Sequence, residues 1–144
     1  MIVGTVPKQV EYALMALTDM QAARPGQLFA VRGLCERHQV PFDVMSKTMQ
    51  RLAKSGILRS VQGASGGYQI TRDLSTVTLL DLMEAVTREV AAVNCLKSCG
   101  CSRADHCTIS RPMNRLNEKM RELYAGLTVT GLIGERAPAV ADAE

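Results

Sequence analysis

The sequence predicts a mainly α-helical fold with one small β-hairpin. Three observations lead to this prediction. Apolar residues recur at helical spacing in three segments before residue 55, two β-prone runs flank a glycine-rich loop at 57–71, and a heptad-like repeat begins at residue 109. The 144 residues suffice for one domain with an appendage, and 47% apolar residues exclude a wholly disordered chain.

Two helices are expected before residue 40. An apolar stripe over 6–22 predicts the first helix, and the Pro-Gly pair at 25–26 ends it. A short second helix is expected over 30–38. It should turn Cys35 inward as a thiol packed in the core, since this cysteine stands alone on an apolar face.

The third helix is expected to have two distinct faces. Asp43 should cap its N-terminus, and the Ser-Gly pair at 55–56 ends it. The face expected to be buried comprises Met45, Met49 and Leu52. The exposed polar face comprises Ser46, Lys47, Gln50 and Arg51. A polar face of this kind can contact base edges and phosphates.

A β-hairpin is expected after the third helix. The β-prone runs 57–62 and 68–71 flank the glycine-rich loop 63–67. Three short helices followed by a hairpin is the element order of a winged helix-turn-helix, whose third helix fits a major groove about 12 Å wide. The wing-tip glycines would let the backbone approach a duplex closely. The same order also occurs in protein-binding modules.

Two further helices are expected in the second half. Thr78 with Asp81 three residues later resembles a capping box that opens a fourth helix. A long helix is expected over 109–127 and carries an apolar heptad seam. The seam comprises Ile109, Met113, Leu116, Met120, Leu123 and Leu127. Such a seam needs a partner, and the simplest partner is a second copy, so a long dimerisation helix and a homodimer are expected.

These elements divide the chain into four expected parts. Residues 1–88 should form a winged helix-turn-helix DNA-binding domain and 89–108 a cysteine-rich cluster-binding loop. Residues 109–136 should hold the dimerisation helix and a C-terminal helix, and 137–144 a disordered tail. No apolar run approaches about 18 residues and the start shows no secretory signal, so a cytoplasmic protein with no membrane partner is expected.

The distribution of charge is more informative than its sum. Residues 1–80 hold 9 basic and 5 acidic side chains, a balance of +4, whereas 81–144 hold 8 and 9, a balance of −1. A local basic surface of this kind can attract phosphate, and the alternative is an ordinary solvated face. An enzyme is not expected, because there is no nucleophile–base constellation, no phosphate-binding loop and almost no histidine.

Four of the five cysteines lie close together in the chain. Cys95, Cys101 and Cys107 are evenly spaced with five residues between neighbours, Cys99 lies between the first two, and the CxxC pairs of zinc ribbons are missing. Wide, even gaps suit a loop around a bulky iron–sulfur cluster better than a compact tetrahedral zinc site. Zinc and metal-free redox thiols remain the alternatives at this point.

Four motifs are similar to those of a known protein family. They are the opening at 10–14, the helix end and wing at 52–68, the segment 77–86 and the three-cysteine pattern. Together they resemble the Rrf-two family of bacterial winged-helix regulators over about residues 8–133, a family that includes iron–sulfur and nitric-oxide sensors. The resemblance implies a homodimer that binds double-stranded DNA at a palindromic operator.

The resemblance also implies the cluster ligands. Cys95, Cys101 and Cys107 match the family's three cysteine ligands of a 2Fe–2S or 4Fe–4S cluster, placed between the long helix and the partner's DNA-binding domain. The fourth ligand varies among relatives, and the histidine that some use after the last cysteine is Ser110 here. The remaining candidates are Glu11 and His38, which match ligands of other relatives, and the extra thiol Cys99.

The DNA contacts are carried over from the family more loosely. The family reads DNA with the third helix and a wing residue that is often arginine. Here Gln62 holds that wing position, and it brings no charge into the minor groove. The expected contacts are Ser46, Lys47 and Gln50 for bases, Lys47, Arg51, Lys54 and Arg59 for phosphates, and Gln62, Gly63 and Ser65 in the wing.

These observations predict a dimeric DNA-binding transcription regulator. Its operator affinity would be controlled by an iron–sulfur cluster that senses redox state, iron–sulfur status or nitric oxide. The first alternative is a metal-free thiol-switch or zinc-stabilised repressor of the same fold. The second is a cluster-assembly or electron-transfer protein with a helical docking domain.

Overall fold

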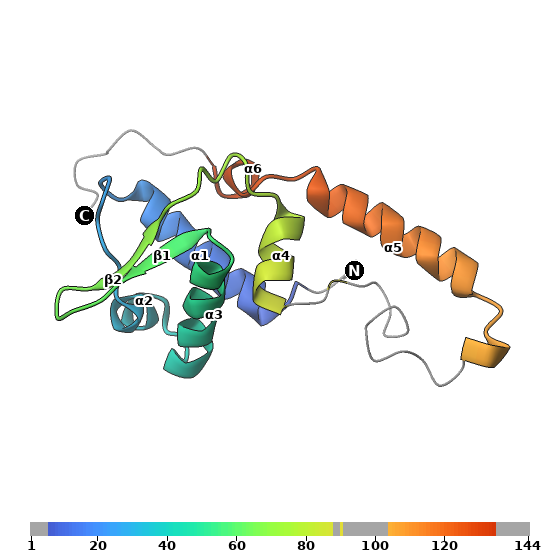
Figure 1. Cartoon of the computed structure of the whole chain (residues 1–144), viewed down its shortest axis with the longest axis horizontal. Helices are drawn as coiled ribbons and strands as arrows, with labels where there is room; N and C mark the ends of the chain where they lie inside the picture. Colours follow the sequence, from blue (N-terminus) through green and yellow to red (C-terminus); the bar gives the residue numbers. More distant parts are fainter. Residues whose placement is uncertain (1–5, 88–89, 91–103, 135–144) are drawn as a thin grey trace.

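The computed structural model describes residues 6–87, 90 and 104–134. Its elements are α1 (Lys8–Ala22), α2 (Val31–His38), α3 (Phe42–Lys54), β1 (Leu58–Val61), β2 (Gly67–Ile70), α4 (Leu79–Thr87), the 3₁₀ turn η2 (Ala104–His106), α5 (Ser110–Ala125) and α6 (Val129–Ile133). This is the mainly helical fold with one hairpin that the sequence predicts (Figure 1). None of the described helices is long and apolar enough to cross a membrane.

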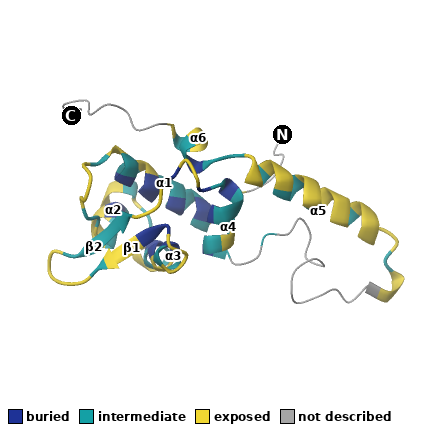
Figure 2. Ribbon diagram, turned by 45° about the horizontal axis from the view of Figure 1, so that its top comes forward, coloured by how far each residue is buried: buried dark blue, intermediate teal, exposed yellow. Residues whose placement is uncertain are grey.

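The hydrophobic core is built around α1. This helix packs against α3, α4 and β2, and its inward face includes Val10 and Leu17, both without exposed surface. The expected inward residues of α3, Met45, Met49 and Leu52, are likewise fully buried. Figure 2 shows this dark-blue interior in the helical body, which contrasts with the exposed surface of α5.

The start of α4 confirms the predicted capping box. The Thr78 backbone N–H donates to Asp81 Oδ2 at 3.1 Å, and the Asp81 N–H donates to Thr78 Oγ1 at 3.0 Å. The two residues thus satisfy each other's free amide groups at the helix entry. The helix buries Leu79, Leu82 and Val86 against the core.

The start of α3 differs from the prediction that Asp43 is its N-cap. The helix begins at Phe42, Pro41 takes the N-cap position, and Asp43 lies inside the first turn. Proline has no backbone N–H to leave unsatisfied, and Pro41 holds φ at −63°, which suits a helix entry. The predicted N-cap therefore lies two residues after the observed one. Asp43 still places a negative charge near the positive end of the helix dipole.

The hairpin pairs β1 with β2 antiparallel, with Leu58 opposite Ile70 and Val61 opposite Gly67. A third segment joins it, because Phe29 and Tyr68 exchange backbone hydrogen bonds of 2.9 Å in both directions. This contact explains one wing glycine. A Cβ on Gly67, whose φ is 155°, would lie 2.7 Å from the Phe29 carbonyl oxygen. Gly67 therefore allows a close backbone approach between the wing and the segment at Phe29.

Helix α5 extends away from the helical body (Figure 1) and has no buried residue along its length. The chain then returns to the body. Leu79 N–H donates to Leu127 O at 2.7 Å, and Val129 N–H donates to Val77 O at 2.8 Å. Val129 is fully buried in the core, so the short α6 packs with the helices that precede the cysteine segment. The expected tail, 137–144, lies outside the described residues.

Candidate nucleic-acid interface and cysteine segment

The outer face of α3 is polar and basic. Lys47, Gln50 and Lys54 are exposed, and Ser46 is half-buried beside them. Gln50 Nε2 donates to Ser46 Oγ at 3.3 Å, so the two predicted base-contacting side chains lie together one helical turn apart. The buried methionines of α3 face the opposite way. The helix thus presents hydrogen-bonding groups and positive charge to solvent, as a major-groove helix requires.

Arg51 points elsewhere. Its guanidinium NH1 donates to the backbone carbonyl of Val86, at the end of α4, over 2.6 Å. The side chain is half-buried, unlike those of Lys47 and Lys54 on the same helix. Arg51 was one of the four residues predicted to contact phosphate. One of its N–H donors is instead used in a hydrogen bond within the protein.

The wing carries the remaining predicted contacts. Arg59 lies opposite Gln69 in the hairpin, and the Gln69 side-chain oxygen, turned toward it, accepts from Arg59 Nε at 2.7 Å and NH2 at 3.0 Å. This pairing holds the exposed Arg59 side chain on the wing surface. Gln62, Gly63 and Ser65 are exposed in the loop, and Gln62 Nε2 donates to Ser60 Oγ at 3.4 Å.

Phe42 is a candidate that the sequence reasoning missed. It is the first residue of α3, and 51% of it is exposed. It precedes Ser46 by one helical turn, so it lies beside the polar face of α3. The sequence did contain a signal for Phe42, because an aromatic residue there lies outside the buried stripe of the helix.

Of the four clustered cysteines, Cys107 lies in the described part of the chain. It follows η2, three residues before α5, and it is a half-buried free thiol. Cys95, Cys99 and Cys101 lie outside the described residues. Glu11 lies in the first turn of α1, where its carboxylate is 3.7 Å from Lys8 Nζ and is partly exposed.

His38 is paired with a carboxylate that the sequence reasoning did not single out. Its Nε2 lies 2.6 Å from Oδ2 of Asp19, a side chain of α1 that is only 8% exposed. Arg37 Nε lies 3.5 Å from the same oxygen. When Nε2–H donates to Asp19, Nδ1 keeps its lone pair, which is the arrangement of many metal-bound histidines.

The described ligand candidates of one chain do not converge. Glu11 and His38 belong to the helical body, whereas η2, next to Cys107, lies beyond the far end of α5 (Figure 1). Within the described residues, no group of three or more His, Cys, Asp or Glu side chains could hold a metal ion. A site that used both Glu11 and Cys107 would therefore need two copies of the chain.

Comparison with known proteins decides the family. The model of the Rrf2 (Rrf-two) family, described as iron-dependent transcriptional regulator, matches residues 6–135. The chain belongs to the Rrf2 family. This confirms the resemblance seen in the sequence. No curated protein matches the chain at a significant level.

Solved structures support the winged-helix fold of this Rrf2 protein. CymR (YrzC), the global cysteine regulator of B. subtilis, aligns with a TM-score of 0.66 at 14% identity, over 91% of this chain and 97% of CymR. Staphylococcus aureus CymR aligns with a TM-score of 0.66 at 14% identity, over 92% of this chain and 100% of that protein. IscR of T. potens aligns with a TM-score of 0.65 at 18% identity, over 91% of this chain and 87% of IscR.

Membership of the Rrf2 family makes the protein a DNA-binding transcriptional regulator.

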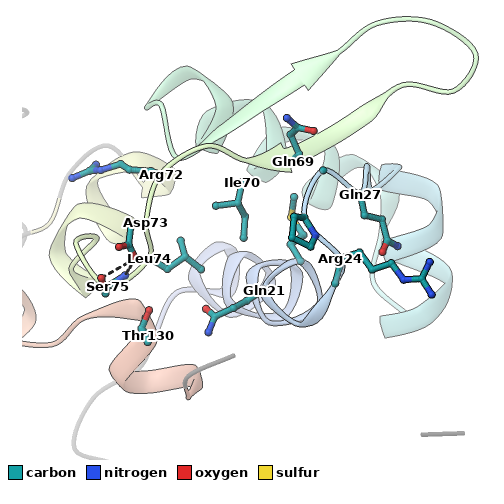
Figure 3. Close-up of a pocket in the computed structure, with 14 residues that line it drawn as sticks. Gln21, Arg24, Gln27, Gln69, Ile70, Arg72, Asp73, Leu74, Ser75 and Thr130 are labelled. Carbon is teal, nitrogen blue, oxygen red and sulfur yellow. Dashed lines mark hydrogen bonds between the residues drawn. The ribbon is translucent and has the colours of Figure 1, made fainter. Parts of the chain in front are cut away.

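One pocket of this regulator lies apart from both regions described above. It has a volume of about 450 Å³ and lies between the end of α1, the segment after β2, and α6. Figure 3 shows Ile70 and Leu74 at its centre, with the guanidinium groups of Arg24 and Arg72 pointing away from them. Its centre is therefore apolar, and these two guanidinium groups do not point into it.

Proposed function

We propose that the protein is a homodimeric transcription regulator whose operator affinity is controlled by an iron–sulfur cluster. The observation that carries this proposal is the even spacing of Cys95, Cys101 and Cys107 in an Rrf2 chain. Thiolates at wide, regular gaps suit iron–sulfur ligation. The cluster would respond to redox state, iron–sulfur status or nitric oxide, and the protein would act in the cytoplasm.

The dimer is supported by α5. Part of its apolar seam is exposed, with Leu116 44% and Leu123 59% exposed, whereas Met113 and Met120 are half-buried. Leu127 lies beyond the end of α5 and packs against the core of its own chain. Apolar side chains at heptad spacing on an unburied helix indicate association with a second helix. A second copy satisfies this requirement symmetrically, because each chain then covers the same seam of the other.

The donor set fits a cluster shared between two chains. The cysteines that precede α5 in the chain would supply the thiolates, and the partner's α1 or α2 would supply the remaining ligand. Glu11 is half-exposed in the first turn of α1, and His38 has its Nε2 fixed by Asp19. Cys99 is the alternative on the same segment. When bound, such a cluster supplies a change of charge or of ligation that depends on redox state.

The proposed DNA contacts follow from exposure on α3 and the wing. Ser46, Lys47 and Gln50 would reach base edges, while Lys47, Lys54 and Arg59 would bind phosphates. Gln62, Gly63 and Ser65 would contact the duplex from the wing. Phe42 would pack against a thymine methyl group, the apolar feature of the major groove. A dimer would read a palindromic operator with half-sites about 34–36 Å apart.

The test is anaerobic purification followed by absorption spectroscopy, iron and sulfide assays, and binding to a duplex selected by the protein from a random library. We expect visible absorption and about two or four irons per subunit. The variant C101A should lose the chromophore, and C35A serves as the matched control that keeps it. A coloured C101A protein would contradict the ligand assignment. A colourless wild-type protein after reconstitution would contradict the cluster itself.

A thiol switch is the second candidate function, and the solved structures favour it as the rival. One of them is described as the oxidised form of Staphylococcus aureus CymR, with a TM-score of 0.65 at 15% identity. In this chain the half-buried free thiol of Cys107 would take part, with or without a structural zinc ion. A colourless protein whose DNA affinity changes on oxidation would support this candidate. One zinc per subunit would indicate the zinc-stabilised form.

A further inference from the structure

Two arginines hold the end of α4 from different helices. Arg51 of α3 donates through NH1 to Val86 O at 2.6 Å. Arg121 of α5 donates through NH1 to Val90 O at 3.1 Å and through NH2 to Glu84 Oε2 at 3.1 Å. The acceptors therefore lie within seven residues of one another along the chain, at the end of α4 and just beyond it.

The Val86 carbonyl, one of the last four carbonyls of α4, needs a donor from outside the helix. The last four carbonyl groups of an α-helix have no partner within the helix, and the C-terminus carries partial negative charge. An arginine guanidinium suits both the unpartnered carbonyls and the negative end of the helix dipole, since it donates several hydrogen bonds and stays charged. Val86 itself has no exposed surface, so its carbonyl has little access to water, and Arg51 supplies it with a donor.

We infer that Arg51 is a positioning residue and not a phosphate contact, and that Arg51 and Arg121 together couple the recognition helix to α5 through the end of α4. The inference rests on the proposed function of α3 as the DNA-reading helix. Helix α4 packs against both α3 and α5, so it is the shared neighbour of the two. A displacement of α5 is transmitted to α3 through these hydrogen bonds.

The salt dependence of DNA binding separates the two roles of Arg51. Losing one phosphate contact reduces the slope of log K against log salt by about 0.9, whereas losing a positioning residue lowers affinity at every salt concentration with the slope unchanged. We expect R51Q to weaken binding to the selected duplex about tenfold with the wild-type slope. K54Q, the matched control on the exposed face of α3, should reduce the slope.

A second measurement does not depend on DNA. Hydrogen–deuterium exchange of the free protein should be faster at the α3–α4 contact in R51Q, and R51K should restore part of the protection because lysine still offers a donor. K54Q should leave exchange unchanged. Should R51Q reduce the salt slope by about 0.9 without faster exchange, Arg51 would be a phosphate contact and the inference would be overturned.

Arg121 supplies the test of coupling. R121Q should keep the wild-type salt slope and chromophore, while the difference in DNA affinity between cluster-loaded and cluster-free protein shrinks at least threefold. K119Q, on the same helix with an exposed side chain, is the control that keeps this difference. An R121Q protein with the full difference would refute the coupling. Failure of wild-type protein to bind any duplex would instead refute the proposed function, while exchange would still test the α3–α4 bond.

Discussion

Helices α1 and α5 have nearly equal lengths and opposite surroundings. The fifteen residues of α1 include five buried ones, whereas none of the sixteen residues of α5 is buried. Both helices carry an apolar stripe at helical spacing. The comparison teaches that periodicity specifies which face of a helix is apolar and does not specify what covers it. An isolated helix of this length is only marginally stable in water. Helix α5 therefore needs a packing partner, which α1 already has in α3 and α4.

The largest expected effect is on the core side of this comparison. Leu17 has no exposed surface, so L17A removes buried methyl groups and leaves a cavity, which should cost about 2–5 kcal/mol of the free energy of unfolding. Urea denaturation at several protein concentrations measures this loss, which should be the same at all of them. The matched variant L123A on α5 should act only where dimer forms. An equal, concentration-independent loss in L123A would show that α5 is covered within its own chain.

The seam of α5 gives the next effect. The double variant L116D/L123D places two carboxylates on the surface proposed to pair with a second copy. Burying unpaired charges is costly, so the dimer dissociation constant should rise at least about a hundredfold. Sedimentation equilibrium reports the mass. R115Q/K119Q changes the charge of α5 by the same amount off the seam and should remain dimeric. A dimeric L116D/L123D protein would place the interface elsewhere.

The sequence predicted the elements whose signals are local. The spacing of Met45, Met49 and Leu52 specified the buried face of α3, and Thr78 with Asp81 specified the start of α4. The start of α3 was missed because Pro41, with its fixed φ and no backbone N–H, takes the N-cap position two residues before Asp43. The error was confined to two residues and left both faces of the helix unchanged.

The candidate site was less predictable because its decisive contacts join distant segments. Asp19 and His38 meet only once α1 and α2 pack, and Arg51 reaches Val86 across 35 positions of the sequence. An arginine on a polar helix face has the same local signal whether it contacts phosphate or a helix end. Lys54, in contrast, could be placed from spacing alone because it faces solvent.

The smallest expected effect concerns Cys35, a thiol of α2 that packs against the core. Burial, with a lesser contribution from Glu36, raises the pKa of this thiol. The protonated form is therefore favoured in the folded protein, and because only the thiolate reacts, alkylation at neutral pH should be slow. Mass spectrometry of iodoacetamide-treated protein should show the Cys35 rate still rising above the pH at which an unfolded control levels off. L17A should accelerate the reaction by opening the core, and L123A should not. Fast alkylation of Cys35 in the wild-type protein at neutral pH would show that this thiol is accessible and not protected by packing against the core.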